Sequence, residues 1–317
     1  MKTAVHNTRT TKNWKSWLAA IRPPFYSVGV IPFLLGAILA SSHGYNVAVP
    51  LLLLSVMAVI LIMLSTYLLG EYYDFESDRV NKDFNRFSGG SRVFIHGYSP
   101  HKALLTVAYS AAFLAALIGL VLHLYYGTGI FTLPLGITGL ILGLFYSSRP
   151  LQLAYRGIGE FSVSFCYGWL TVNSGYYIFA GSFHPAATLI SLPVGLSIFT
   201  VILINEFPDY QADKATGKNN LVVRMGRLKA AYIYLILTGL TMLLLLINLN
   251  LDEIYSGNTW FFLLPLALGT INIIAVYKKL YLDKSYLEKI CGATIMFNLL
   301  VSSSYILSLL DNMLRIS

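Results

Sequence analysis

The stretch VAVPLLLLSVMAVILIMLSTYLLGEYYDFESD, residues 47–78, joins an apolar run of membrane-crossing length to a pair of aspartates, Asp74 and Asp78. The same spacing returns 135 residues later, where a second apolar run is followed by Asp209 and Asp213. Side chains four residues apart project from one face of a helix, so each pair forms one acidic face. A carboxylate at the edge of the hydrocarbon layer is costly and by default marks a functional site.

Four gathered carboxylates also predict a bound metal ion. Neighbouring carboxylates repel each other and raise one another's pKa. A divalent cation removes that repulsion, and hard oxygen ligands suit Mg²⁺. We therefore predict that the four aspartates bind Mg²⁺.

The composition predicts a membrane protein. Hydrophobic residues make up 56% of the 317 residues and charged residues only 11%, a balance that no soluble domain of this size needs. Apolar runs of roughly 18 to 24 residues recur, and each can cross a hydrocarbon core of about 30 Å as a helix. Backbone groups in lipid must bond within their own segment, and no alternating pattern favours strands, so we predict an all-α integral membrane protein. The nine expected spans are residues 25–42, 47–70, 102–124, 128–146, 158–181, 185–206, 228–249, 258–280 and 287–310.

The basic residues predict the topology. Of the 22 Lys and Arg residues, all but Arg315 fall in the N-terminal tail or in the links on one side of the expected membrane. The positive-inside rule then puts the N-terminus and both acid pairs in the cytoplasm. We expect a multi-pass protein of the cell (inner or plasma) membrane whose active site faces the cytoplasm. The net charge of +8 is then a topology signal rather than a nucleic-acid footprint.

The chain divides into a tail and one domain. Residues 1–24 are polar and basic, and they predict a cytoplasmic tail that becomes interfacial near Trp14 and Trp17, without a cleaved signal peptide. Residues 25–317 are expected to form a single transmembrane domain. Because the acid pairs repeat after four spans, that domain is expected to contain a four-helix pseudo-repeat. Cys166 and Cys291 each fall inside a span without a CxxC partner, so we predict no disulfide.

Several smaller patterns predict packing. A small-residue face on the first span suits close contact with another helix, and polar residues of the last three spans are expected to bond between helices. Arg156 and Glu160 stand four residues apart, and an ion pair is one interpretation of that spacing. The small residues are Gly29, Gly36 and Ala37, and the polar residues are Asn248, Asn272, Asn298 and Ser302 to Ser304.

Glycines and basic residues surround the acid pairs. Gly89 and Gly90 allow a close turn with free amides, and Arg86 and Arg92 can bind an anion by charge-assisted hydrogen bonds. A solvated, positively charged loop stays an alternative for each of these basic residues.

Acid pairs beside basic residues suit a diphosphate. Mg²⁺ bridging carboxylates to a diphosphate satisfies both sets of charges, and Arg and Lys stabilise the charge that develops as the diphosphate leaves. If the group left behind is allylic, apolar and aromatic side chains shield its cation from water. The membrane interior accepts a long hydrocarbon tail. The predicted chemistry is therefore prenyl transfer.

The same residues resemble the UbiA superfamily of intramembrane aromatic prenyltransferases, from residue 22 to the ninth span. The stretch NEFPD at residues 205–209 with Asp213 and Lys218 is similar to the family's second carboxylate motif, and YSSR at residues 146–149 resembles its Tyr-x-x-Lys element. Two separate stretches, RFSGGSR at residues 86–92 and Gly159-Glu160, look most like the branch that includes 1,4-dihydroxy-2-naphthoate polyprenyltransferases of menaquinone synthesis.

The resemblance implies nine helices around a central cavity, Mg²⁺ as cofactor, and an isoprenoid diphosphate and an aromatic acceptor as substrates, with the lipid bilayer as surroundings and no nucleic-acid partner. It assigns Asp74, Asp78, Asp209 and Asp213 to metal–diphosphate binding, and Tyr146 to the catalytic residues. The implied diphosphate contacts are Lys82, Arg86, Arg92, Arg149, Lys214, Lys218 and Asn205.

One departure from the family concerns the first motif, which usually opens Asn-Asp-x-x-Asp-x-x-x-Asp. Here Gly70-Glu71 stands where Asn-Asp is expected. Gly70 offers no side-chain ligand. Either Glu71 reaches the metal with its extra methylene, and it joins the expected ligands on that ground, or water takes the place.

Two alternatives stay open. Another acceptor of the same family, such as 4-hydroxybenzoate or a lipid or pigment precursor, keeps the chemistry and changes the pathway. A cation-coupled transporter also suits repeated acidic motifs, although transporter sites lie near the midplane at broken helices and these acids lie at helix ends. A purely structural role leaves the paired aspartates unexplained.

Overall fold

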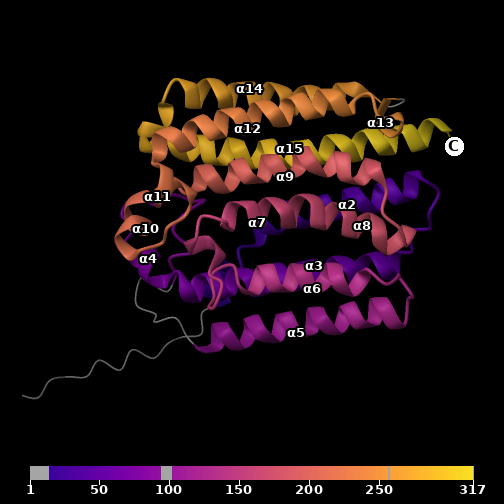
Figure 1. Ribbon diagram of the computed structural model, residues 1–317, viewed down its shortest axis with the longest axis horizontal. Coiled ribbons are helices and arrows are strands. Elements are labelled where there is room, and N and C mark those ends of the chain that lie inside the picture. The colour runs from indigo at the N-terminus through magenta and orange to yellow at the C-terminus, as the bar shows by residue number, and fades with distance from the viewer. Residues whose placement is uncertain (1–13, 94–101, 256–257, 317) are drawn as a thin grey trace, which may run out of the picture.

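The computed structural model describes residues 14–93, 102–255 and 258–316, and every regular element in these ranges is a helix (Figure 1). Seven helical segments are long and apolar enough to cross a membrane, which confirms the all-α membrane class. They are Trp17–Ser42, built from α1 (Trp14–Ala20), η1 (Pro23–Tyr26) and α2 (Ser27–Ser42); α3 (Val49–Tyr73); α5 (Lys102–Leu124); α9 (Pro185–Asn205); α12 (Arg227–Asn248); Thr259–Tyr277, built from η4 (Thr259–Phe262) and α14 (Leu263–Tyr277); and α15 (Lys284–Ile316).

Two expected spans are shorter or interrupted. The fourth is α6 (Thr132–Leu144), of 13 residues. The fifth runs through α7 (Gly159–Phe165), the π-helical turn η3 (Cys166–Leu170) and α8 (Thr171–Ala180). Within η3, a Cβ on Gly168 would lie 2.5 Å from the Cα of Gly195 in α9, so the two backbones touch where the helix changes its winding. A π turn inside a helix is frequent near functional sites.

The N-terminal tail contains more helix than the sequence predicted. Its first 13 residues lie outside the described part of the chain, but α1 forms within the expected tail. Pro23 and Pro24 begin the tight turn η1, where their missing amides cost nothing, and α2 follows directly. The first membrane segment therefore begins before the prolines rather than after them.

The long helices lie side by side along the longest dimension of the molecule, with α5 at one edge and α14 at the other (Figure 1). At the left of the view the short helices α4 (Phe75–Val80), α10 (Tyr210–Thr216) and α11 (Leu221–Met225) gather at one end of the bundle, which we call the acid end. The short helix α13 (Asp252–Tyr255) lies at the right of the view, at what we call the far end. Each acid pair is thus carried by a short helix at the same end.

The small-residue face of the first span is used as predicted. A Cβ on Gly175 of α8 would meet the carbonyl oxygen of Phe33, and a Cβ on Gly36 would meet that of Val172. These two glycines let α2 and α8 approach backbone to backbone, which in lipid is a main source of helix association. The polar residues of the last spans also bond between helices in part: Asn248 Nδ2 donates to Tyr305 Oη at 2.9 Å, and Asn298 Nδ2 donates to Ser197 Oγ at 2.8 Å.

Candidate active site

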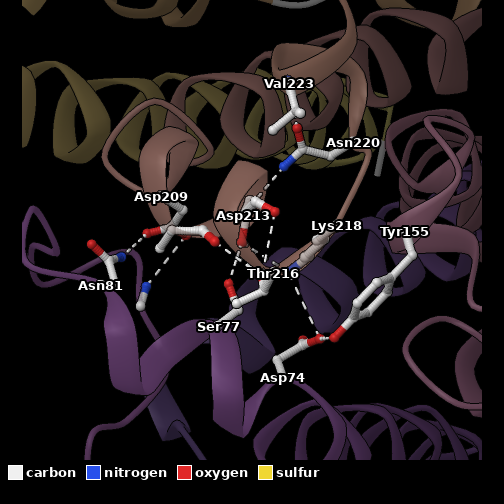
Figure 2. Close-up of polar contacts among 12 residues, drawn as sticks. Asp74, Ser77, Asn81, Tyr155, Asp209, Asp213, Thr216, Lys218, Asn220 and Val223 are labelled. Carbon is white, nitrogen blue, oxygen red and sulfur yellow. Dashed lines mark hydrogen bonds and ion pairs between the residues drawn. The ribbon is translucent and has the colours of Figure 1, made fainter.

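The four aspartates line one cavity because α4 packs against α10 at the acid end, and Figure 2 shows Asp74, Asp209 and Asp213. The helical path of α3 is interrupted for one residue at Asp74 and resumes as α4, so Asp74 and Asp78 stand at the two ends of its first turn. Asp209 is the residue before α10, and Asp213 lies within that helix. The two acidic faces expected from the sequence therefore face one another.

Residues of the first motif hold the second pair in place. Ser77 Oγ donates to Asp213 Oδ1 at 2.5 Å, and Asn81 Nδ2 donates to Asp209 Oδ1 at 2.7 Å (Figure 2). Asn220 Nδ2 donates to the other Asp213 oxygen at 2.8 Å. Each carboxylate of the second pair therefore has a fixed orientation, because its partners come from two separate segments.

Lys218 lies between the two motifs. Its Nζ is 3.7 Å from Asp74 Oδ1 and 4.0 Å from Asp213 Oδ1. Asp74 also accepts hydrogen bonds from Tyr155 Oη at 2.7 Å and from Ser147 Oγ at 3.1 Å. Burial lowers the pKa of Lys218, but the carboxylates of Asp74 and Asp213 raise it well above its usual value, so the lysine is a fixed positive charge.

Asp78 is the least satisfied carboxylate of the site. In the described part of the chain its carboxylate accepts no hydrogen bond, and the left-handed Gly90 packs so closely against it that any Cβ would clash. Burial, with Asp74 next in importance, raises the pKa of Asp78 to about 8. Burial and Asp213 raise the pKa of Asp209 to about 6, against the opposing effect of Lys218 and of hydrogen bonds from Ser88 and Gly89. A bound cation would therefore stabilise the charged form of both carboxylates.

Glu71 is bound by protein groups. Its Oε1 lies 2.9 Å from Arg22 Nη2 and accepts from the amide of Ser91 at 2.8 Å, while Oε2 accepts from Ser91 Oγ at 2.6 Å. The carboxylate is buried. Glu71 therefore ties the loop after α4 to the residue that precedes η1, and its role as a metal ligand stays a prediction.

The other predicted site residues divide into three groups. Tyr146 and Asn205 line the same cavity as the aspartates and Lys218. Arg92 lies behind Asp78, where Nη1 donates to the backbone oxygens of Asp78 and Asn81. Four further basic residues are exposed and are not part of the cavity wall: Lys82, Arg86, Arg149 and Lys214.

The cavity has a volume of about 550 Å³ and runs from the aspartates into the bundle. Its walls beyond the acid end are apolar, and they come from α2, α3, α5, α6, α8 and α9. Two of its lining residues are Leu122, near the C-terminal end of α5, and Leu135, near the N-terminal end of α6. The cavity therefore extends along the helices, away from the aspartates. A polar head with a long apolar tail would fit this shape.

The Arg156–Glu160 interpretation is wrong. Glu160 Oε1 instead accepts from the amide of Leu221 at 2.6 Å, and Arg156 Nη2 donates to the carbonyl oxygen of Pro150 at 2.9 Å. Glu160 is buried against Glu206 of the second motif, and burial together with Glu160 raises the pKa of Glu206 well above its usual value. The two carboxyl groups thus share a site beside the cavity.

Four residues of the site escaped the sequence analysis: Ser77, Asn81, Tyr155 and Asn220. Asn81 gave a signal, because it follows Asp78 by three residues and so lies near the same helical face. Tyr155 and Asn220 gave none, since their loops reach the site only through the fold.

Comparison with known proteins shows the family of the chain. Residues 29–298 match the model of the UbiA prenyltransferase family. The chain is 29% identical to 1,4-dihydroxy-2-naphthoate octaprenyltransferase of Bacillus subtilis (strain 168), over 65% of this chain and 64% of that relative, slightly under two thirds of its length. It is 30% identical to the enzyme of the same name from Escherichia coli (strain K12), over 79% of this chain and 81% of the relative.

A solved structure with a similar fold is a UbiA homolog from Archaeoglobus fulgidus bound to GPP and Mg²⁺. Its TM-score is 0.58 and its sequence identity 14%, and the match covers 92% of this chain and 99% of the homolog. At that identity the likeness concerns the fold.

Proposed function

The chain belongs to the UbiA prenyltransferase family, and from that premise we propose that it transfers a prenyl group from an isoprenoid diphosphate to an aromatic acceptor, a quinone precursor such as 1,4-dihydroxy-2-naphthoate. The observation that carries the proposal is the position of two acid pairs, the second of them held by Ser77 and Asn81, at the mouth of a long and mainly apolar cavity. A diphosphate fits the polar mouth, and its hydrocarbon tail fits the apolar walls.

The donor set at the mouth fits Mg²⁺. It consists of carboxylate oxygens, which are hard ligands, and burial and neighbouring carboxylates raise the pKa of Asp78 and of Asp209, so a cation would stabilise their charged forms. Asp74, Asp78, Asp209 and Asp213 would hold the ion. When bound, Mg²⁺ neutralises charge on the diphosphate and makes it a better leaving group.

The protein's own residues supply the remaining parts of the reaction. Lys218 holds a positive charge 3.7 Å from Asp74, where it can bind a diphosphate oxygen and stabilise the charge that forms as the C–O bond breaks. Tyr146 lines the cavity beside this mouth and can face the allyl cation with its ring. The apolar walls exclude water, so that the ring carbon of the acceptor, and no hydroxide, forms the new bond.

The orientation follows from charge. Among the residues that the structure describes, almost all Lys and Arg belong to the acid end or to the links and helix ends beside it, so we place this end on the cytoplasmic side of the inner or plasma membrane. Residues 25–317 form the single transmembrane domain of this proposal, with the acid pairs as the trace of a four-helix repeat.

Transfer by purified protein in detergent tests the proposal. The assay supplies Mg²⁺, a labelled prenyl diphosphate and a panel of aromatic acceptors, and we expect a prenylated product with 1,4-dihydroxy-2-naphthoate. Asp74→Asn and Asp209→Asn should abolish most of the product, whereas Lys278→Ala, an exposed change outside the cavity, should not.

Product with another acceptor only would keep the reaction and overturn the acceptor. Full activity in both aspartate variants would overturn the site. Ion flux in proteoliposomes without any prenyl donor would favour a transporter instead.

A further inference from the structure

A second cluster of metal-ligating side chains lies at the far end, away from the aspartates. It contains His43, which ends α2; His184, which precedes α9; and Glu253 of α13. One ligand atom of each residue lies within 4.8 Å of the others. Within the described ranges, it is the one group of three or more His, Cys, Asp or Glu side chains that meets this geometry.

The distances suit a tetrahedral ion. His43 Nε2 lies 3.5 Å from Glu253 Oε1, and His184 Nδ1 lies 4.0 Å from the same oxygen. Ligand bonds of about 2.0–2.1 Å place the ligands of a tetrahedral zinc ion roughly 3.4 Å apart. Small rotations of the side chains would bring the three atoms to that spacing.

The hydrogen bonds around the cluster fix which ring nitrogens can act as ligands. His184 Nδ1 accepts from the amide of Ala186 at 3.2 Å, so this nitrogen carries no proton. His43 Nδ1 lies 2.8 Å from Tyr176 Oη, and in the tautomer whose Nδ1–H donates to that oxygen, Nε2 presents a lone pair to Glu253. A cation at the centre would bind Nε2 and the carboxylate, and it would take the lone pair of His184 Nδ1 from the Ala186 amide.

The cluster has the surroundings of a metal site. A histidine that binds a metal usually donates its other ring N–H to a fixed acceptor, as His43 can to Tyr176. The two imidazole rings lie with centroids 4.5 Å apart, so both histidines face the same small space. Asn312 Nδ2 donates to the backbone oxygen of Glu253 and anchors α13 against α15. The ligands are therefore held by separate parts of the chain.

We propose that His43, His184 and Glu253 bind one Zn²⁺-type divalent cation, with water as the fourth ligand. Two imidazoles and a carboxylate form a donor set typical of Zn²⁺ and unlike the all-oxygen set at the acid end. Binding joins the ends of α2, α9 and α13 and stabilises the far end. The Ala186 amide gives up its long bond to His184, and as a first-turn amide it can bond water instead.

The test uses tag-free protein in detergent, freed of metal and then kept in excess Mg²⁺ to occupy oxygen sites. Zn²⁺ is titrated while bound metal and the melting temperature are measured. Wild type should bind one more Zn²⁺ than His184→Asn and Glu253→Gln, and only wild type should gain melting temperature from it. His184→Asn keeps a side-chain acceptor before α9, so loss of the helix cap does not confuse the result.

Two further variants sharpen the test. Tyr176→Phe should keep the stoichiometry and weaken Zn²⁺ binding about 10-fold or more, as loss of an outer hydrogen-bond partner does. His123→Ala removes a histidine that donates to Gly129 near the same end and should bind Zn²⁺ as wild type does. Equal stoichiometry and equal stabilisation in wild type, His184→Asn and Glu253→Gln would overturn the site. None of these readouts uses prenyl transfer, so failure of the proposed function would leave this test intact.

Discussion

The two acid motifs have the same spacing, but their carboxylates are hydrogen-bonded to different extents. In the second motif, Asp213 is 2% exposed and both of its oxygens accept side-chain hydrogen bonds. In the first motif, the carboxylate of Asp78 accepts none within the described residues, and Asp74 is bound by groups that arrive from later loops. The helix α4 orients its partner motif through Ser77 and Asn81 more than it orients its own acids.

The two motifs therefore have different roles, although their spacing is the same. The second motif is preorganised, because its charges are fixed before any ligand arrives. In the first motif the pKa of Asp78 is raised, so a nearby cation would stabilise its charged form. We expect the first motif to respond most to Mg²⁺, and the second to fail most when its braces are removed.

The largest expected effect comes from removing one charge in each motif. Asp78→Asn and Asp213→Asn should each lower kcat/KM on the order of 10²–10³-fold, since each removes a negative charge that would hold Mg²⁺ beside the diphosphate. Their effects on stability should differ in sign. In metal-free protein, Asp78→Asn should raise the melting temperature by removing a crowded carboxyl group, and Asp213→Asn should lower it.

The reason for the loss at Asp213 is geometric. An asparagine amide would meet the donor Nδ2 of Asn220 or the hydroxyl of Ser77, so one buried donor is left unpaired at a cost of about 1–3 kcal/mol. Melting curves in EDTA read this out directly. Shifts of the same sign in both variants would remove the distinction between the motifs.

A smaller effect is expected from the brace itself. Asn81→Ala removes the 2.7 Å bond to Asp209 and should lower activity about 10–100-fold, as loss of a partner that orients a metal ligand does. The matched control is Glu76→Gln, which alters an exposed residue of the same helix and its ion pair with Arg79. Steady-state kinetics should show the control within about twofold of wild type. Equal losses in the two variants would mean that α4 acts only through its general stability.

The smallest effect is a dependence of stability on pH. The folded state holds a proton on Asp78 up to about pH 8, whereas the unfolded chain releases it near its usual pKa. Between those values the folded state binds more protons at Asp78, so this group should make the free energy of unfolding of metal-free protein fall as pH rises, by at most about 1.4 kcal/mol per pH unit from Asp78 alone. Chemical denaturation across this range measures the slope.

Asp78→Asn should flatten that slope, and saturating Mg²⁺ should flatten it as well, because the ion binds the deprotonated form and neither state then binds a proton at Asp78. A slope of opposite sign in the metal-free wild type would contradict the raised pKa. Mg²⁺ affinity should rise with pH over the same range.

The sequence predicted the parts of the site that depend on local spacing. Aspartates four residues apart share a helical face whatever surrounds them, and apolar length alone predicts a membrane-crossing helix. Asp209 and Asp213 therefore take the same positions relative to α10 as Asp74 and Asp78 take relative to α4. Lys218 was also recognisable, because it follows the second pair within a short segment.

The spacing of residues did not predict which way a side chain points or which distant residues it contacts. Lys214 directly follows Asp213, but one step along a helix turns a side chain by about 100°, and it points to solvent. Ser77 bonds a residue 136 positions away, a contact that only the packing of α4 on α10 creates. The π turn in the fifth span likewise depends on Gly195 of another helix.

The glycine contact between α2 and α8 makes one side of the cavity stiff. Gly36 and Gly175 meet backbone on backbone, so this side cannot widen without losing that contact. Gly136 of α6 lines the same cavity, and a Cβ at that position would meet no heavy atom from elsewhere in the described chain within 4 Å. A hydrocarbon chain inside the cavity would therefore find space beside Gly136, while the α2–α8 side keeps its shape.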